Sequence, residues 1–581
     1  MKMKNKFIPT LLSALTLAGV ASSLAACGPK KPIDSADVED PNKTQLNVYS
    51  YNGGYRAEWL DKTAAAFEEA VKDKSYESGK TGVQIHIHRD KANKAVTDVT
   101  QLDSSKDEVF FTEHVDYDGY TQAQSGNRFL DLTDVVTETS PYDSKTIESK
   151  MNDAQKSFLQ QNGRYYAIPH YSGFYGLIYN VEMFQKNNFY IDVDGNLCAE
   201  TNKEKGNGPD GIKGTDDDGL PATFDQFFDL CTYIRAQNIY SVHWTGQYYT
   251  MHLSELYRAL AANIDGVDNT MLSSTYDGTV TNAVKLNAAG EPAEITYEEG
   301  RPVHASSITT ESVKVEDKKG SREGAYRTLG NYYGGEFIQR LLHSEYGGND
   351  YFSTKAFTDT YSHLNAQSDF VRSDTAYATK ENGKNGKAMN YAMLVDGPWW
   401  ESEARETFDQ MEKSDPNLAK EKRNFAWMPL PFPTQGMVGT KPTLYDNISA
   451  FAFAKASLSG GKAAAAKDLL RFAYSDNQLV EFTKDTGVKR NLKYDIPEDA
   501  YKSMTPYGKS LARYMDGANV VFPYVNTTYF QSNFQTLTGS TQYYQASFSG
   551  KTYNAPAAFR SINNLSAEDW FSAFYRAKKG N

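Results

Sequence analysis

The chain has 581 residues, which is too many for one hydrophobic core and enough for two large lobes or three small domains. Its formal charge of -12 argues against nucleic acid and against anionic membrane surfaces as partners. The sequence holds 40 tyrosines. Tyrosine suits surfaces that bind polar, ring-shaped ligands, because it joins a flat apolar face to a polar tip, although a tyrosine-rich core and loops explain most of these residues equally well.

The first 26 residues have the pattern of a secretory signal peptide. A basic cluster precedes an apolar run from about Phe7 to Leu24, which is barely long enough to span a bilayer. The run ends in Leu-Ala-Ala-Cys-Gly, which resembles the bacterial lipobox, where the signal is removed and the new N-terminal cysteine carries lipid. The alternative is an ordinary signal with an incidental cysteine. We therefore expect residues 1–26 to be removed and Cys27 to anchor the protein at the extracellular face of the cell membrane.

Residues 27–44 lack a periodic apolar pattern and are expected to form a flexible tether after the lipidated cysteine. The alternation in Gln45–Tyr51 predicts a first strand, which ends at the turn Asn52-Gly53-Gly54. An amphipathic helix follows, and then two further strands over residues 83–88 and 108–112. This order predicts an α/β fold that begins with a largely parallel sheet.

The stretch Asn162–Asn180 contains Gly-x-x-Tyr-Ala-x-Pro followed by Leu-Ile-Tyr-Asn. This run resembles the first crossover between lobes in the extracellular solute-binding proteins of ABC importers, the maltose-binding-protein group. Thr223 and Gln226 also have the spacing of a helix capping box. Other segments resemble that family in collinear order, namely Leu220–Phe227 (a helix start), Asp396–Trp400 (the Gly-x-Trp ligand segment) and Met437–Ala454 (the return to the first lobe).

The resemblance implies an α/β, two-lobed periplasmic-binding-protein-like fold with a hinge and a ligand cleft between the lobes. The chain is longer than the simplest family members, so insertions into the second lobe are expected. The crossovers imply that lobe 1 comprises residues 45–169 and 436–490, and that lobe 2 comprises residues 170–435 and 491–581, with insertions near 185–221 and 263–330.

A cleft for sugars needs aromatic platforms for the ring faces and polar side chains for the hydroxyl groups. Trp399 aligns with the family's stacking tryptophan. The best-known members carry an acidic residue soon after the crossover proline, and this chain instead has His170 and Tyr171 there. The predicted ligand-binding residues are Asn52, Tyr55, Arg56, Glu113, His114, Asp116, His170, Tyr171, Trp244, Trp399 and Trp400.

Two acidic, glycine-broken loops lie in the first expected insertion. The first opens like an EF-hand, but its twelfth position is Lys203 instead of glutamate, so it is not an EF-hand. One hypothesis is that both loops close on a single structural calcium ion, and the alternative is a pair of solvated Asx-turns. The calcium ligands would be Asp192, Asp194, Asn196, Asp210, Asp216 and Asp218.

Together these observations predict a lipid-anchored receptor that captures an oligosaccharide and delivers it to ABC permease subunits by hinge closure. We expect a monomer that is not an enzyme and requires no cofactor, since the sequence has no Gly-x-Ser-x-Gly, His-Glu-x-x-His or phosphate-binding loop. The alternatives are the same fold with a non-sugar solute such as a peptide, and a surface glycoside hydrolase with two carboxylates across a cleft. Cys198 and Cys231 could form one disulfide in an oxidising exterior.

Overall fold

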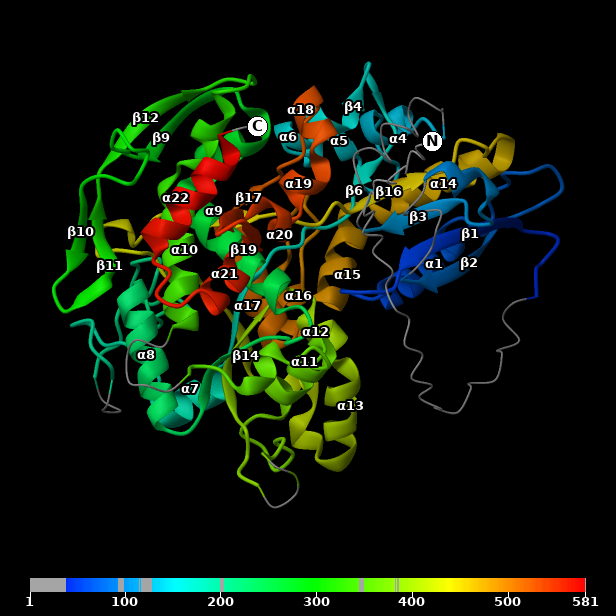
Figure 1. Cartoon of the computed structure of the whole chain (residues 1–581). Helices are drawn as coiled ribbons and strands as arrows, with labels where there is room; N and C mark the ends of the chain where they lie inside the picture. The colour runs from blue at the N-terminus through cyan, green and yellow to red at the C-terminus, as the bar shows by residue number, and fades with distance from the viewer. Residues whose placement is uncertain are drawn as a thin grey trace, which may run out of the picture. The chain divides into compact units, whose positions relative to one another are not determined.

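The computed structural model describes residues 38–91, 99–113, 115, 128–198, 203–343, 350–381, 383 and 386–579. Pro41–Asn581 forms one compact unit (Figure 1). The predicted signal peptide and Cys27 lie outside the described residues, so the lipid anchor stays a prediction. Among the residues that are described, no helix combines the length and the apolar character needed to cross a membrane.

The first sheet has five strands in the order β2-β1-β3-β16-β6. Strand β1 pairs in parallel with both β2 and β3, whereas β16 runs antiparallel to β3 and β6. The three strands expected at the start of the chain are therefore confirmed, and the parallel beginning of the sheet with them. The bounds are β1 Thr44–Tyr51, β2 Val83–Asp90, β3 Val109–Thr112, β6 Ile168–Pro169 and β16 Phe451–Ala454, with helices α1 Glu58–Ala70 and α14 Gly460–Ala473 packed against them.

The second sheet has four strands in the order β14-β7-β13-β8. Its helix α8 begins with the predicted capping box, in which Thr223 Oγ1 accepts from the Gln226 N–H and Gln226 Oε1 accepts from the Thr223 N–H, both at 3.3 Å. The bounds are β7 Gly176–Asn180, β8 Tyr240–His243, β13 Tyr391–Asp396 and β14 Phe425–Met428, with α8 Phe224–Ala236, α9 Tyr249–Thr275, α10 Leu329–Leu342 and α11 His363–Arg372.

The chain passes between the two sheets at two points that bear on the site. It leaves the first sheet after β6 and enters the second at β7, and it returns between β14 and β16. On the return, β15 (Thr443–Tyr445) pairs in parallel with β17 (Asn519–Val521). The expected two-lobed α/β architecture is confirmed, while the exact lobe boundaries stay a prediction.

The second expected insertion is built from two β-hairpin-like ribbons. Strands β9 (Gly278–Val284) and β12 (Thr310–Val315) pair antiparallel, as do β10 (Ile295–Glu298) and β11 (Arg301–Ile308). Both ribbons pack against α10, and Figure 1 shows them (green) beside it. The preceding helix α9 is interrupted at Gly266, whose φ of 70° is not helical.

The remaining elements are shorter and cover the sheets or the connections. They are α4 Thr133–Thr137, α5 Ile147–Lys150, α6 Asp153–Leu159, β4 Gln160–Gln161, β5 Arg164–Tyr165, α7 Val181–Asn187, α12 Trp400–Glu403, α13 Arg405–Ser414, α15 Asp476–Thr486, α16 Glu498–Ser503, α17 Pro506–Gly517, α18 Thr528–Ser532, α19 Phe534–Thr538, α20 Ser540–Tyr543, β18 Gln545–Phe548, β19 Lys551–Asn554, α21 Ala555–Ser561 and α22 Ala567–Lys578.

Aromatic side chains fill much of the two large cores. In the first, Phe110 of β3 stacks on Phe453 of β16 with ring centroids 5.1 Å apart. The second core gathers α8, α9 and α10 around the second sheet. Cys198 and Cys231 are both buried there, and the disulfide that the sequence allows does not join them.

Candidate functional site: a cleft between the two sheets

A cavity of about 420 Å³ lies between the two sheets. The first-sheet side supplies Tyr51 at the end of β1 and Glu113 directly after β3. The second-sheet side supplies Asp396 at the end of β13. The carboxyl ends of strands are the usual place for a ligand in open α/β sheets, and the volume falls within the range of small-molecule sites.

Helices complete the second-sheet side of the cavity. Trp399 and Glu403 come from the segment that contains α12, and His363 begins α11. The start of α9 and the segment around α19 form further walls. Their lining residues are Tyr248, Met251, His252, Glu255, Phe534, Gln535, Thr538 and Gly539.

Trp399 is held in place by two tyrosine rings. Tyr55 approaches it at 6.3 Å and Tyr175 at 5.2 Å between ring centroids, both edge to face. Such T-shaped contacts are the preferred geometry of aromatic pairs, because the positive edge of one ring meets the negative face of the other. The indole is therefore fixed by its neighbours and can act as a rigid platform.

The turn after β1 brings backbone into the rim of the cavity. Gly54 has a φ of 49°, and a Cβ there would lie 3.1 Å from Glu113 Oε1 and 3.6 Å from Trp399 Cβ. Its N–H donates to Glu403 Oε1 over 3.2 Å, which joins the first-sheet side to the second. Glycine is needed at this position, because it tolerates the left-handed conformation and leaves room between three cavity residues.

Four buried or nearly buried carboxyl groups face the cavity: Glu113, Glu255, Asp396 and Glu403. Neutral groups supply most of the hydrogen bonds that are resolved at them. Tyr171 donates its hydroxyl proton to Glu113. The Gln367 amide bridges two of the four, donating to Asp396 Oδ2 at 3.0 Å and to Glu403 Oε2 at 2.9 Å.

Burial raises the pKa values of three of these acids, Glu113, Glu255 and Asp396. Burial and then the charge of Glu403 raise the pKa of Glu113 to about 8, against the opposing charge of Lys91. The same two causes raise the pKa of Asp396 to about 7. Burial also raises the pKa of Glu255, and it lowers the pKa of His252 to about 4, so that this imidazole is neutral near pH 7. The cavity thus combines an aromatic platform with a concentration of acceptors.

Solved structures resemble the chain over nearly its whole length. One is the SBP RafE in complex with raffinose, with a TM-score of 0.50 and 11% identity, covering 92% of this chain and 100% of that chain. The chain has the fold of solute-binding proteins. Another match, from work on xylan utilization by the thermophilic bacterium Caldanaerobius polysaccharolyticus, has a TM-score of 0.50 and 13% identity over 92% of this chain and 99% of that chain. No family model and no curated protein matches the sequence.

Within this solute-binding fold, two of the predicted ligand-binding residues, Glu113 and Trp399, line the cavity. Tyr55 and Tyr171 lie directly behind them, Tyr55 against the Trp399 ring and Tyr171 on the Glu113 carboxyl group. Arg56 pairs instead with Glu58, with Nε and Oε1 3.0 Å apart. Asn52, which was also predicted, does not line the cavity. His114 and Asp116 lie outside the described residues.

Three predicted residues belong to the cores. His170 is buried and its Nδ1 lies 3.1 Å from Arg490 Nη1. Trp244 is fully buried and donates its indole proton to the Ala356 carbonyl at 2.9 Å. Trp400 does not line the cavity and packs in the first core against the rings of Phe370, Phe425 and Tyr507. We therefore assign these three side chains to packing.

Several cavity residues were not among the predicted ones. Glu403 follows Trp399 by four positions, which places both on one face of a helical turn, so this residue had a local signal. Asp396 stood inside the motif that identified Trp399. His363 and Glu255 had no local signal, because only the packing of α11 and α9 brings them to the cavity.

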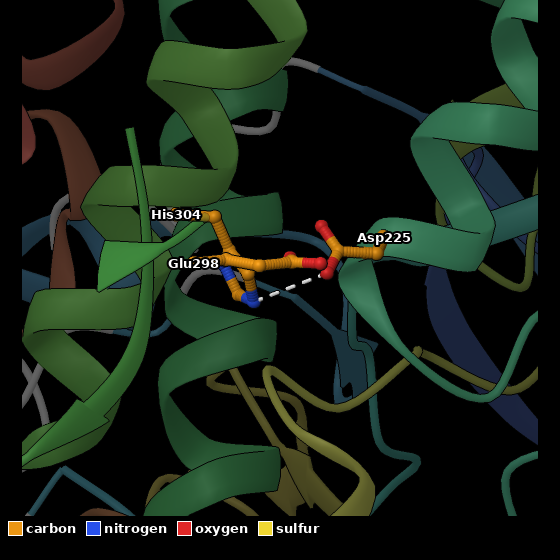
Figure 2. A group of neighbouring side chains, drawn as sticks. All are labelled: Asp225, Glu298 and His304. Atoms are coloured by element: carbon orange, nitrogen blue, oxygen red, sulfur yellow. Dashed lines mark ion pairs between the residues drawn. The ribbon is translucent and has the colours of Figure 1, made fainter. Parts of the chain in front are cut away.

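A second acidic group lies where α8 meets the second expected insertion, and Figure 2 shows it. Asp225 of α8, Glu298 of β10 and His304 of β11 converge there, with His304 Nε2 3.5 Å from Asp225 Oδ2. Within the described part of the chain this is the group whose atoms are close enough to hold a metal ion. Two guanidinium groups already contact the Asp225 carboxylate, from Arg340 at 2.7 Å and Arg301 at 2.9 Å. These cations would repel a metal ion, so we assign the group to an ion-pair network.

The acidic loops of the first insertion show the bonds of Asx-turns. Asp192 Oδ1 accepts from the N–H groups of Asp194 at 3.0 Å and Asn196 at 2.9 Å, and Asp192 Oδ2 pairs with Lys203 Nζ at 2.7 Å. In the second loop, the predicted calcium ligands bond to the backbone or to arginine, as Asp210 does to the Ile212 N–H, Asp218 to the Gly214 N–H and Asp216 to Arg513. Structural calcium stays a prediction, which calorimetric titration after chelation tests, since absence of heat would exclude it.

Proposed function

We propose that this protein is the substrate-binding component of an ABC importer and that it captures an oligosaccharide in the cleft between its two sheets. The observation that carries the proposal is the cavity in which Trp399 faces a set of acidic hydrogen-bond acceptors. A sugar offers an apolar ring face to the indole and hydroxyl donors to the carboxylates. The likeness in fold to RafE, which was solved with raffinose, supports the same ligand class.

The binding step would be a closure of the two sides around the ligand. In the structure the sides already touch at the rim, through the Gly54 N–H on Glu403 and through Glu58 near Arg405, whose charged atoms lie 3.8 Å apart. A ligand that contacts Trp399 on one side and Glu113 on the other favours the closed form, because only that form satisfies both contacts. The closed form would then dock on the permease, and no covalent chemistry takes part.

The sequence pattern at the N-terminus supports the anchoring part of the proposal. Cleavage before Cys27 and lipidation of its thiol would hold a monomeric receptor at the outer face of the membrane. Mass spectrometry of the protein purified from membranes tests this step. We expect a diacylglyceryl-modified N-terminal cysteine, and a Cys27→Ala variant that leaves the membrane fraction. An unmodified N-terminus upstream of Cys27 would contradict the anchor.

Thermal unfolding of the purified protein in the presence of neutral oligosaccharides and of peptides tests the ligand class. A ligand that binds only the folded state raises the melting temperature with the logarithm of its concentration over its Kd. We expect at least one neutral or substituted oligosaccharide to raise it, with no hydrolysis product on chromatography. A shift with peptides alone would contradict the sugar, and release of product would favour a hydrolase.

A further inference from the structure

We propose that the saccharide taken by this cleft carries a protonated amine, as an amino sugar does. The proposal rests on the function proposed above and concerns the charge of the ligand. We infer the positive charge of the ligand from two observations on the described residues. Acidic groups outnumber basic groups in the cavity lining, and most of these acids form no ion pair with lysine or arginine.

The charged groups that face the cavity are mostly acidic. Among the described residues, four carboxyl groups line it, on the loop after β3, on α9, on β13 and on α12: Glu113, Glu255, Asp396 and Glu403. One lysine, Lys91, reaches the lining, and two histidines do so, His252 and His363. His252 is held neutral by burial, which leaves Lys91 and His363 as the groups that could balance the acids.

Within the described part of the chain, lysine and arginine do not pair with three of the four acids. No lysine or arginine of the described chain forms an ion pair with Glu255, Asp396 or Glu403, and the His363 ring nitrogen lies 4.0 Å from Glu403. The charge of Arg258 lowers the pKa of Glu255, but the Nη atoms of this arginine donate to the carbonyl groups of Leu537 and Thr538. The acids are therefore solvated by amide, hydroxyl and backbone donors instead of by charge.

A neutral sugar would satisfy hydrogen bonds here, but Glu113 and Asp396 would still ionise only against burial and the charge of Glu403. Buried like charges repel strongly because the surrounding medium screens them little. An ammonium group on the ligand would supply the missing charge and would form charge-assisted hydrogen bonds, which are about twice as strong as neutral ones. The raised pKa values of Glu113 and Asp396 agree with this, because a cation beside these two groups would favour their ionised forms.

The aromatic wall distinguishes an amino sugar from a simple amine. Trp399 offers its face both to a sugar ring and to a cation. The cavity of about 420 Å³ exceeds what one ammonium group needs. The ring and the amine would therefore act together, the ring on the indole and the amine among Asp396, Glu403 and Glu113.

Matched ligands test the proposal by calorimetry on the purified protein. Chitosan tetrasaccharide and cellotetraose share their β-1,4 linkage. Each ring of the first carries an ammonium group at C2, where the second carries a hydroxyl group. Putrescine provides the amine without a sugar ring. We expect chitosan tetrasaccharide to bind about tenfold more tightly than cellotetraose, a difference that shrinks in 0.5 M NaCl, with putrescine weaker than both.

Substitutions assign the preference to the cavity. Asp396→Asn and Glu403→Gln should each remove most of the difference between the two saccharides. Glu401→Gln is the matched control, because Glu401 is a buried carboxyl group on the same short helix that does not line the cavity. It should retain the full difference.

The outcomes separate this inference from the proposed function. Equal affinity for the two tetrasaccharides, or a preference for cellotetraose or any other neutral oligosaccharide, would overturn the amine and leave the sugar receptor standing. Binding of putrescine alone would overturn the saccharide part of both proposals. A failure of chitosan, neutral oligosaccharides and putrescine together would overturn both. Retention of the preference in both cavity variants would overturn the assignment of its residues.

Discussion

Two groups of carboxyl groups in this protein, one around Asp225 and one in the cleft, differ in how the surrounding residues compensate their negative charge. Around Asp225, the acids are neutralised by the chain itself, because the guanidinium groups of Arg340 and Arg301 contact its carboxylate. Burial would raise the pKa of Asp225, but the hydrogen bond with Glu298 and the charge of Arg340 lower it to about 2. In the cleft the acids have neutral donors, and the pKa values of Glu113 and Asp396 rise instead.

The difference separates a structural ion-pair network from the proposed binding site. The Asp225 network joins α8, α10 and the β10–β11 ribbon, since His304 Nδ1 also lies 2.6 Å from Glu336 Oε1 of α10. Its charges are complete without a ligand. The cleft acids are held ready by Gln367, Tyr171 and backbone, at a cost in stability that a bound ligand can offset.

Removal of a cation from the network should have the largest effect on stability. Arg340 is 1% exposed, and Arg340→Met would leave the partly buried Asp225 and the fully buried Glu336 with Arg301 as the remaining guanidinium group of the network. We expect a loss of about 3–5 kcal/mol in the free energy of unfolding, measured with urea. Arg513→Ala, which removes an exposed partner of Asp216, is the control and should cost less than about 1 kcal/mol. Equal losses in the two variants would show that the buried network has no special role.

Removal of the aromatic platform should have the next largest effect, on binding. Trp399→Ala is expected to weaken saccharide binding by about 1–3 kcal/mol, because it deletes a fixed aromatic anchor at the centre of the cavity. Calorimetry with the best saccharide measures the change. Tyr377→Ala provides a control, since Tyr377 is exposed and lies outside the cavity lining. An unchanged affinity in a folded Trp399→Ala protein would place the sugar elsewhere.

The buried Glu113 should make the free energy of unfolding depend on pH. The folded-state pKa of Glu113, about 8, lies above its unfolded value. The contribution of Glu113 to the stability of the ligand-free protein is therefore fully present below about pH 4.5 and is lost as the pH rises through 8. Glu113→Gln cannot ionise. We expect it to be as stable as the wild type near pH 5 and more stable by about 2–4 kcal/mol at pH 9.

Urea unfolding of both proteins across this pH range measures the difference. Glu412→Gln is the control, because Glu412 is exposed on α13. A gap between wild type and Glu113→Gln that stays constant with pH would mean that Glu113 is not desolvated in the folded protein.

The smallest effect is expected from the outer acid of the network. The hydrogen bond with Asp225 raises the pKa of Glu298, and burial adds to this, whereas the pKa of Asp225 is lowered, so Glu298 is the better proton donor in this hydrogen bond and an amide can replace it. Glu298→Gln should therefore change the free energy of unfolding by less than about 1 kcal/mol at pH 6. A larger loss in urea unfolding would mean that the carboxylate form of Glu298 is the one that stabilises the network.

Local patterns predicted the parts of the fold that depend on local physics. The alternation at Gln45–Tyr51 and the capping box at Thr223 and Gln226 are properties of a few neighbouring residues, and both are present in the structure. The position of Trp399 followed from a resemblance that spans five residues. Trp244 and Trp400 carried equally suggestive aromatic signals, but tertiary packing buries both of their rings away from the cavity.

The rest of the site depends on which helices meet. Glu255 lies within α9 and His363 at the start of α11, and nothing in their immediate sequence distinguishes them from other charged surface residues. They became cavity residues because the second sheet places both helices over the same strand ends. Long-range placement of this kind leaves no trace in a window of ten or twenty residues.

The pairing of β15 with β17 limits how the two sides of the cleft can move. The connection that leads from β14 back to β16 is not a loose string, because Thr443–Tyr445 is held in a parallel ladder to Asn519–Val521 and is packed on α9. A ladder of this kind twists easily and resists shear, since sliding would break its hydrogen bonds. We therefore expect the connection to allow rotation more readily than sliding, so that an opening of the cleft would turn one side about this short ribbon with little translation past the other.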